Sequence, residues 1–165
     1  TRLLDGRWVP TFPNARYIFA RDEYRQAEAQ MRLDASAGHP QAFADSVLPV
    51  MEAGQAVLVD NDHEIDHGVW LEPAPGHTPG NVVVNLTSGG DSAVLSGDVI
   101  HHPVQLLRPE WSSRACEDRP QSRRTRRAFI ERYADTNTLI APAHFPSPSL
   151  GYIIGQDDHF GYRDA

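Results

Sequence analysis

The hexapeptide Pro75-Gly76-His77-Thr78-Pro79-Gly80 places a single histidine in a turn built from glycine and proline. The two glycines allow the backbone to turn tightly on either side of His77, and Pro75 and Pro79 stiffen the turn. An imidazole held on a rigid turn is a suitable ligand for zinc or a similar divalent ion. A histidine in such a setting is also a common turn residue, so this stretch alone leaves both interpretations open.

Two later stretches have the same character. Ser96-Gly97-Asp98 and Ala143-His144-Phe145 each follow a short apolar strand candidate and carry one metal-capable side chain. Taken singly, Asp98 could cap a turn or a helix, and His144 could be a buried, hydrogen-bonded histidine. Taken together with His77, they predict that two imidazoles and a carboxylate meet at the rim of a sheet.

In this order and with these neighbours, the three stretches resemble the C-terminal half of the metallo-β-lactamase-fold hydrolases. Pro-Gly-His77-Thr-Pro-Gly is similar to the second-histidine motif of that family, Ser-Gly-Asp98 to its bridging-aspartate motif, and Ala-His144-Phe to its last-histidine motif. The segment 97–127, with His101-His102-Pro103 ahead of an arginine-rich helix, resembles a lactonase- and organophosphate-hydrolase-like branch. The resemblance implies His77, Asp98 and His144 as metal ligands.

The same resemblance implies the chemistry of a metal-dependent hydrolase. In the intact enzyme, a hydroxide between two divalent ions, with zinc as the expected metal, would attack an ester, lactone, amide or phosphoester of a small-molecule substrate. The ions would lower the pKa of that water and polarise the substrate oxygen, so no separate protein nucleophile is required. The sequence does not specify the substrate, and the same nitrogen and oxygen ligands also suit manganese, iron or cobalt.

The hallmark His-x-His-x-Asp-His motif of the family is absent from the chain. The nearest string, residues 62–67, keeps Asp66-His67 but has Asp62 and Glu64 where histidines belong, and it ends only ten residues before His77. In the family, a strand and helices separate the corresponding motifs. We therefore interpret the string as a solvated turn between two strands.

Residues 6–24 resemble the segment that follows the hallmark motif, so we expect residues 1–165 to form a single partial domain that begins just after it. The expected fold class is α/β: the αββα metallo-β-lactamase fold, incomplete, with one sheet and covering helices. Each ion would then keep two protein ligands, with Asp98 shared, whereas zinc sites use three or four. We expect weak or absent metal binding by the chain as it stands, exposed apolar strands and self-association into homo-oligomers.

The alternative is a non-catalytic half-domain that associates with itself or with a partner supplying the missing strands. The sequence upstream of Thr1 discriminates between the two hypotheses. A His-x-His-x-Asp-His string there favours the enzyme, and a start codon immediately before Thr1 favours the half-domain.

Hydrophobic periodicity and turn residues predict the scaffold around these motifs. Strands are expected at 15–20, 56–59, 69–72, 81–87, 93–96, 138–141 and 152–154. Helices are expected at 22–34, 40–53 and 119–135. Loops, turns or irregular segments are expected at 1–14, 60–68, 88–91 and 99–119, and a frayed tail is expected after residue 154.

Several residues near Asp98 are candidates for substrate contacts. One of His101 and His102 could point toward the metal site or the substrate, with hydrogen bonding within the loop as the alternative. We assign His102, together with Trp111 and Phe145, to the substrate pocket. Core packing is the alternative for the two aromatic side chains.

Charge and cysteine content exclude some classes of function. The 165 residues include 15 basic and 22 acidic ones, a net charge of −7, which argues against a nucleic-acid or anionic membrane surface. The basic run 123–127 is accordingly interpreted as a solvated helix face, and no apolar run approaches membrane-spanning length. Cys116 cannot form an internal disulfide, and no nearby histidine or aspartate suggests an activated nucleophile, which predicts an inert thiol in a cytoplasmic protein.

Overall fold

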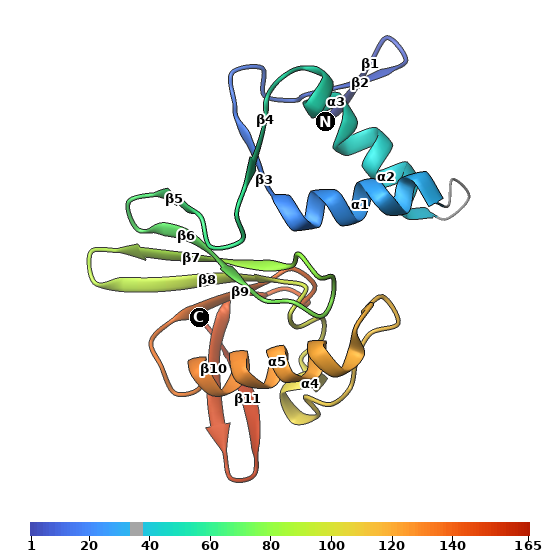
Figure 1. Ribbon diagram of the computed structural model, residues 1–165. Helices are drawn as coiled ribbons and strands as arrows, with labels where there is room; N and C mark the ends of the chain where they lie inside the picture. Colours follow the sequence, from blue (N-terminus) through green and yellow to red (C-terminus); the bar gives the residue numbers. More distant parts are fainter. Residues whose placement is uncertain (34–37) are drawn as a thin grey trace. The chain divides into compact units, whose positions relative to one another are not determined.

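The computed structural model describes residues 1–33 and 38–165, which form two compact units (Figure 1). The N-terminal unit is Thr1–Asp60 and the C-terminal unit is Asn61–Ala165. The expectation of a single partial domain over 1–165 stays a prediction. Within the described residues, every helix is too short or too polar to cross a membrane.

The N-terminal unit begins with a hairpin of β1 (Arg2–Leu4) and β2 (Arg7–Val9). Asp5 and Gly6 connect the strands with φ values of 49° and 77°, the left-handed conformation that two-residue hairpin turns require. A loop was expected over 1–14, so the hairpin is a correction. Strands of three residues are too short to show an alternating pattern in the sequence.

The rest of this unit is a parallel strand pair joined by helices. Its elements are β3 (Tyr17–Ala20), α1 (Arg21–Leu33), α2 (Gly38–Ser46), α3 (Leu48–Glu52) and β4 (Ala56–Val59). Parallel strands need a crossover connection, which the helices provide. The helix expected to end near Asp34 corresponds to α1, and Asp34 itself lies outside the described residues. The single helix expected over 40–53 is wrong: a new helix begins at Leu48, because Pro49 lacks the N–H that would continue the first one.

The C-terminal unit is built on a seven-stranded sheet in the order β11-β10-β9-β8-β7-β6-β5. The strands are β5 (Glu64–Asp66), β6 (Val69–Pro73), β7 (Val82–Ser88), β8 (Asp91–Gly97), β9 (Leu139–Pro142), β10 (Gly151–Gln156) and β11 (His159–Asp164). Neighbours are antiparallel except β8 and β9, which are parallel. The crossover between this parallel pair contains α4 (Val104–Leu107) and α5 (Arg119–Tyr133).

The tail is ordered rather than frayed beyond residue 154, because β11 pairs with β10 along its whole length. Tyr162 anchors the hairpin: its hydroxyl donates toward the carbonyls of Ile140 and Ser149, at 3.0 and 2.8 Å. Its ring packs against the core, and burial raises the pKa of the phenol to about 12. Local sequence patterns do not reveal these contacts, since they join the tail to residues more than ten positions away.

Helix α5 covers one face of the sheet (Figure 1). Asp118 precedes it as the N-cap, and its side chain accepts a hydrogen bond from the Gln121 N–H. Its buried apolar residues, Phe129, Ile130 and Tyr133, join the strand residues of a single hydrophobic core. This packing determines the position of the loops at the end of the sheet where the site forms.

Candidate metal centre

Three connections of the C-terminal unit meet at one edge of the sheet. Asp98 follows the end of β8, and His144 follows the end of the parallel strand β9. Strand β7 is antiparallel to β8, so the loop 74–81 that precedes β7 lies at this same edge. The carbonyl of Val82 is accordingly only 3.6 Å from where a Cβ on Gly97 would be. The topology therefore brings His77, Asp98 and His144 together.

Asp98 is the centre of the cluster. His144 Nε2 donates a hydrogen bond to Asp98 Oδ1 at 2.7 Å, and His77 Nε2 lies 3.6 Å from Asp98 Oδ2. The sequence-predicted residues thus converge on one carboxylate. A fourth residue joins them: His101 Nε2 lies 3.6 Å from Asp98 Oδ1.

The His101 imidazole also contacts the imidazoles of His77 and His144. The rings of His101 and His144 are stacked, with centroids 5.2 Å apart and an angle of 7° between their planes, and the His77 ring lies 4.9 Å from that of His101. The side chains of His77 and His101 are 16% and 18% exposed, whereas His144 is 52% exposed. The cluster therefore has a covered side and a side open to solvent.

The geometry suits one divalent ion. Two ligand atoms bound to a tetrahedral zinc ion lie about 3.3 Å apart. The two distances of 3.6 Å from Asp98 are close to that value, and the ligand atoms of His77, Asp98 and His101 all lie within 4.8 Å of one another. Among the side chains that the structure describes, those of residues 1–33 and 41–165, this trio is the only group of histidine, cysteine or carboxylate side chains so arranged.

The buried Nδ1 and the lowered pKa of His101 also support a site for a divalent ion. Its Nδ1 is buried and has no hydrogen-bond partner among the described residues, and its Nε2 is beyond hydrogen-bond distance of Asp98. Burial lowers the pKa of His101, although Asp98 acts in the opposite direction. A neutral imidazole is the form that binds a metal ion.

Cys116 supports His77 from the side opposite Asp98. Its buried Sγ lies 3.8 Å from His77 Nδ1 and 3.4 Å from Ser122 Oγ. An imidazole that binds a metal through Nε2 carries its proton on Nδ1, where an acceptor orients the ring. The sequence showed no histidine near this thiol, because the two residues are 39 positions apart.

The segment that follows Asp98 is held in place by two buried polar side chains. Gln105 Oε1 accepts a hydrogen bond from the His101 N–H at 2.7 Å, and Gln105 Nε2 donates to the Trp111 carbonyl at 2.8 Å. Arg126 of α5 donates to the carbonyls of Val99, Pro109 and Trp111. Arg126 is fully buried, so the interpretation of the basic run as a solvated face is wrong for this residue.

The residues assigned to a substrate pocket lie in different settings. His102 is exposed, and its Nδ1 accepts a hydrogen bond from the Val104 N–H. Trp111 is 56% exposed. Phe145 belongs to the core, where it packs edge-on against Tyr162 with centroids 5.0 Å apart. The sequence left open which of His101 and His102 points toward the metal site, and in the structure His101 lies next to Asp98.

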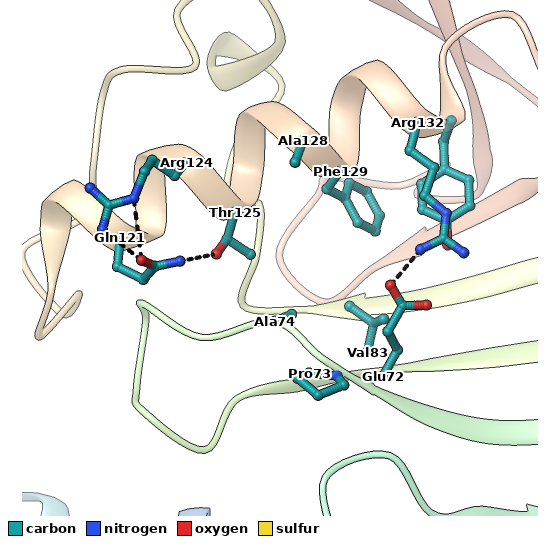
Figure 2. Close-up of a pocket in the computed structure, with 11 residues that line it drawn as sticks. Glu72, Pro73, Ala74, Val83, Gln121, Arg124, Thr125, Ala128, Phe129 and Arg132 are labelled. Carbon is teal, nitrogen blue, oxygen red and sulfur yellow. Dashed lines mark hydrogen bonds and ion pairs between the residues drawn. The ribbon is translucent and has the colours of Figure 1, made fainter.

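A cavity of about 350 Å³ lies between α5 and strands β6 and β7 (Figure 2). Arg124 and Thr125 line it on the helix side, and an ion pair between Arg132 and Glu72 lies at one end. None of the four residues of the metal cluster lines this cavity. It is therefore not the predicted substrate pocket.

The string 62–67, interpreted as a solvated turn, includes the short edge strand β5.

Comparison with known proteins identifies the fold. No protein-family model and no curated protein matches the chain. Among solved structures, it is similar to the hydrolase AbOPH of the β-lactamase superfamily, with a TM-score of 0.81 and 24% identity over 93% of this chain and 56% of that one. It is also similar to AidC, a dizinc quorum-quenching lactonase in complex with a product, with a TM-score of 0.77 and 22% identity over 97% of this chain and 60% of that one.

A probable metal-dependent hydrolase from Staphylococcus aureus matches with a TM-score of 0.64 and 19% identity, over 93% of this chain and 54% of that one. These likenesses show that the chain has the metallo-β-lactamase fold, as the sequence motifs predicted. The chain spans between 54% and 60% of the length of these three structures.

Proposed function

We propose that this chain supplies metal ligands to a metal-dependent hydrolase that acts on a small-molecule ester, lactone or phosphoester. The observation that carries the proposal is the convergence of His77, Asp98 and His144 at the rim of a metallo-β-lactamase-fold sheet. A non-catalytic half-domain is not favoured, because a purely structural role gives no reason for imidazoles to gather around one carboxylate.

Asp98, His77 and His144 have distinct roles in the proposed enzyme. In the intact enzyme, Asp98, His77 and His144 would together hold the divalent metal, for which two zinc ions are proposed. Divalent ions at this position supply Lewis-acid chemistry, lowering the pKa of water and polarising a substrate oxygen. Asp98 and His144, whose side chains are 35% and 52% exposed, form the side of the site that a substrate can reach.

The substrate class is proposed from chemistry and from the solved relatives. AidC is described with N-hexanoyl-homoserine, the product of a lactone, and AbOPH is described as a hydrolase. Both are consistent with attack on a carbonyl or phosphoryl group by an activated water. The buried free thiol of Cys116 is consistent with the reducing cytoplasm predicted from the sequence.

A substrate panel tests the proposal. The complete product of the gene is treated with a chelator and then reconstituted with zinc, manganese or cobalt. It is then assayed on an acyl-homoserine lactone, a nitrophenyl ester and a phosphotriester. We expect hydrolysis of at least one substrate to depend on added metal and to fall by at least about 100-fold in Asp98→Asn, as expected for removal of a metal ligand. Asp66→Asn is the matched control, because Asp66 is an exposed carboxylate outside the cluster.

Full activity after exhaustive chelation would refute the metal mechanism. Equal activity of the Asp98→Asn and Asp66→Asn variants would refute the assignment of Asp98.

A further inference from the structure

His101 is the residue of the cluster that neither the motifs nor the proposed function requires. It lies three residues after Asp98 in a loop fixed by Gln105, whose side-chain oxygen accepts from its backbone N–H. That hydrogen bond and the stacked His144 ring hold the imidazole next to Asp98. Its position is therefore determined by the fold rather than by free rotation at the surface.

The side chain has no other role among the described residues. An imidazole that is 18% exposed should satisfy both nitrogens, since an unpaired buried polar group costs about 1–3 kcal/mol. Nδ1 has no partner, and Nε2 lies 3.6 Å from the Asp98 carboxylate, too far for a hydrogen bond. This separation is instead close to the distance of about 3.3 Å expected between two ligands of one zinc ion.

We infer that His77, Asp98 and His101 form a self-contained site for a single divalent cation, in which His101 is the third protein ligand. The inference rests on the proposed metal-binding role of His77 and Asp98, and it adds a ligand to them. Three protein ligands are the number that catalytic zinc sites use, with a further position left for water or substrate. The site needs no residue from outside the chain.

His144 has a different role in this one-ion site. Its Nε2 is 2.7 Å from Asp98 Oδ1, which is a hydrogen-bond distance and shorter than the spacing of two ligands on one ion. We therefore assign His144 as a positioning residue that donates a hydrogen bond to Asp98 and orients the carboxylate. The expected order of importance for binding one ion is then His101 above His144, the reverse of the order that the sequence motifs imply.

Binding of Co²⁺ and Zn²⁺ to the metal-free 165-residue chain tests the inference by calorimetry and by the visible absorption of Co²⁺. We expect one ion per chain, in contrast to the weak or absent binding expected from the sequence motifs alone, because His101 adds a third ligand. The dissociation constant should rise by more than about 100-fold in His101→Ala, beyond the loss expected for an outer hydrogen-bond partner, and by about tenfold in His144→Ala. His102→Ala is the matched control and should bind as the wild type does, because the His102 side chain is exposed and accepts a hydrogen bond from the Val104 N–H rather than facing Asp98.

A second pair of variants gives a gain of signal that does not depend on a loss of binding. With cysteine at position 101, a thiolate ligand should add a sulfur-to-cobalt charge-transfer band, whereas cysteine at position 102 should not. The wild type provides the baseline for any contribution from Cys116. Circular dichroism of each variant shows whether it folds.

The outcomes separate this inference from the proposed function. Wild-type affinity in His101→Ala, no new band in His101→Cys, or no metal binding by the wild-type chain would each overturn the inference. If one ion binds through His101 but the gene product hydrolyses no substrate, the proposed function fails and the inference stands. If hydrolysis depends on metal while His101→Ala binds metal normally, the function stands and the inference fails.

Discussion

Replacement of Arg126 by methionine should destabilise the C-terminal unit and loosen the loop that carries the metal ligands. The guanidinium is fully buried and donates to the carbonyls of Val99 and Pro109, at 3.0 and 2.7 Å. It also donates to the Trp111 carbonyl, but that oxygen keeps Gln105 Nε2 as a second donor. Methionine fills much of the same volume and offers no donor, so the substitution isolates the loss of hydrogen bonds.

The loss of stability in Arg126→Met is calculated from the two carbonyls, of Val99 and Pro109, that lose their hydrogen-bond donor. Each buried carbonyl without a donor costs about 1–3 kcal/mol, which gives a loss of about 2–6 kcal/mol. Burial lowers the pKa of Arg126, a sign that keeping its charge inside the protein is itself costly, and removal of that charge offsets part of the loss. We expect a decrease of about 3 kcal/mol in the free energy of unfolding, a large fraction of the 5–15 kcal/mol that is typical of a domain.

Urea denaturation followed by tryptophan fluorescence measures this loss. In a Trp8→Phe background the signal comes from Trp70 and Trp111, both in the C-terminal unit. With an m-value of about 2 kcal/mol/M, the midpoint should fall by about 1.5 M. The matched control is Arg127→Met, the next residue of the helix, which is 65% exposed and pairs with Glu131. The control should change stability by no more than about 0.5 kcal/mol.

Unfolding of the Arg126→Met and Arg127→Met variants at the same urea concentration would refute the predicted loss of stability. The prediction also fails if Arg126→Lys restores full stability, because an ammonium cannot reach carbonyls on both sides as the planar guanidinium does. A further consequence concerns the site. Since Val99 follows Asp98 directly, Arg126→Met should also weaken metal binding below the unfolding transition, measured by calorimetry.

Three other predictions follow from the contacts described. Gly76→Ala should destabilise the C-terminal unit by more than about 3 kcal/mol in urea denaturation, because Gly76 has a φ of 130° and a Cβ would come within 2.2 Å of the α5 backbone. Gly89→Ala, at a φ of 60° with open space around it, should cost only about 1 kcal/mol. Cys116→Ala should raise the metal dissociation constant by about tenfold, measured by calorimetry, through loss of the group that orients His77, and unchanged affinity would contradict this role. In an alkaline absorbance titration, Tyr162 should ionise near pH 12, and ionisation at pH 10 would refute its burial. Because its folded pKa lies above the unfolded value near 10, the stabilisation that Tyr162 contributes is complete below pH 10 and is lost as the pH approaches 12.

Local patterns in the sequence were sufficient for most of the scaffold. Strand β7 is rich in valine, the turn Ser88–Asp91 carries two glycines, and α5 shows an N-cap and a helical apolar face. These features depend on residues a few positions apart, which is why they can be read without coordinates. The sequence missed β1, β2 and β5, because strands of three residues carry too little pattern.

The sequence by itself determined which residues could reach a metal ion at a strand end, namely His77, Asp98 and His144, because glycine and proline turn chemistry is local. Only the tertiary structure decided that His101 rather than His102 faces Asp98, and that Cys116 contacts His77. It also decided that one arginine of a basic run is buried. These features depend on the direction in which a loop leaves the sheet and on the helix that packs over it, and no short stretch of the chain encodes either.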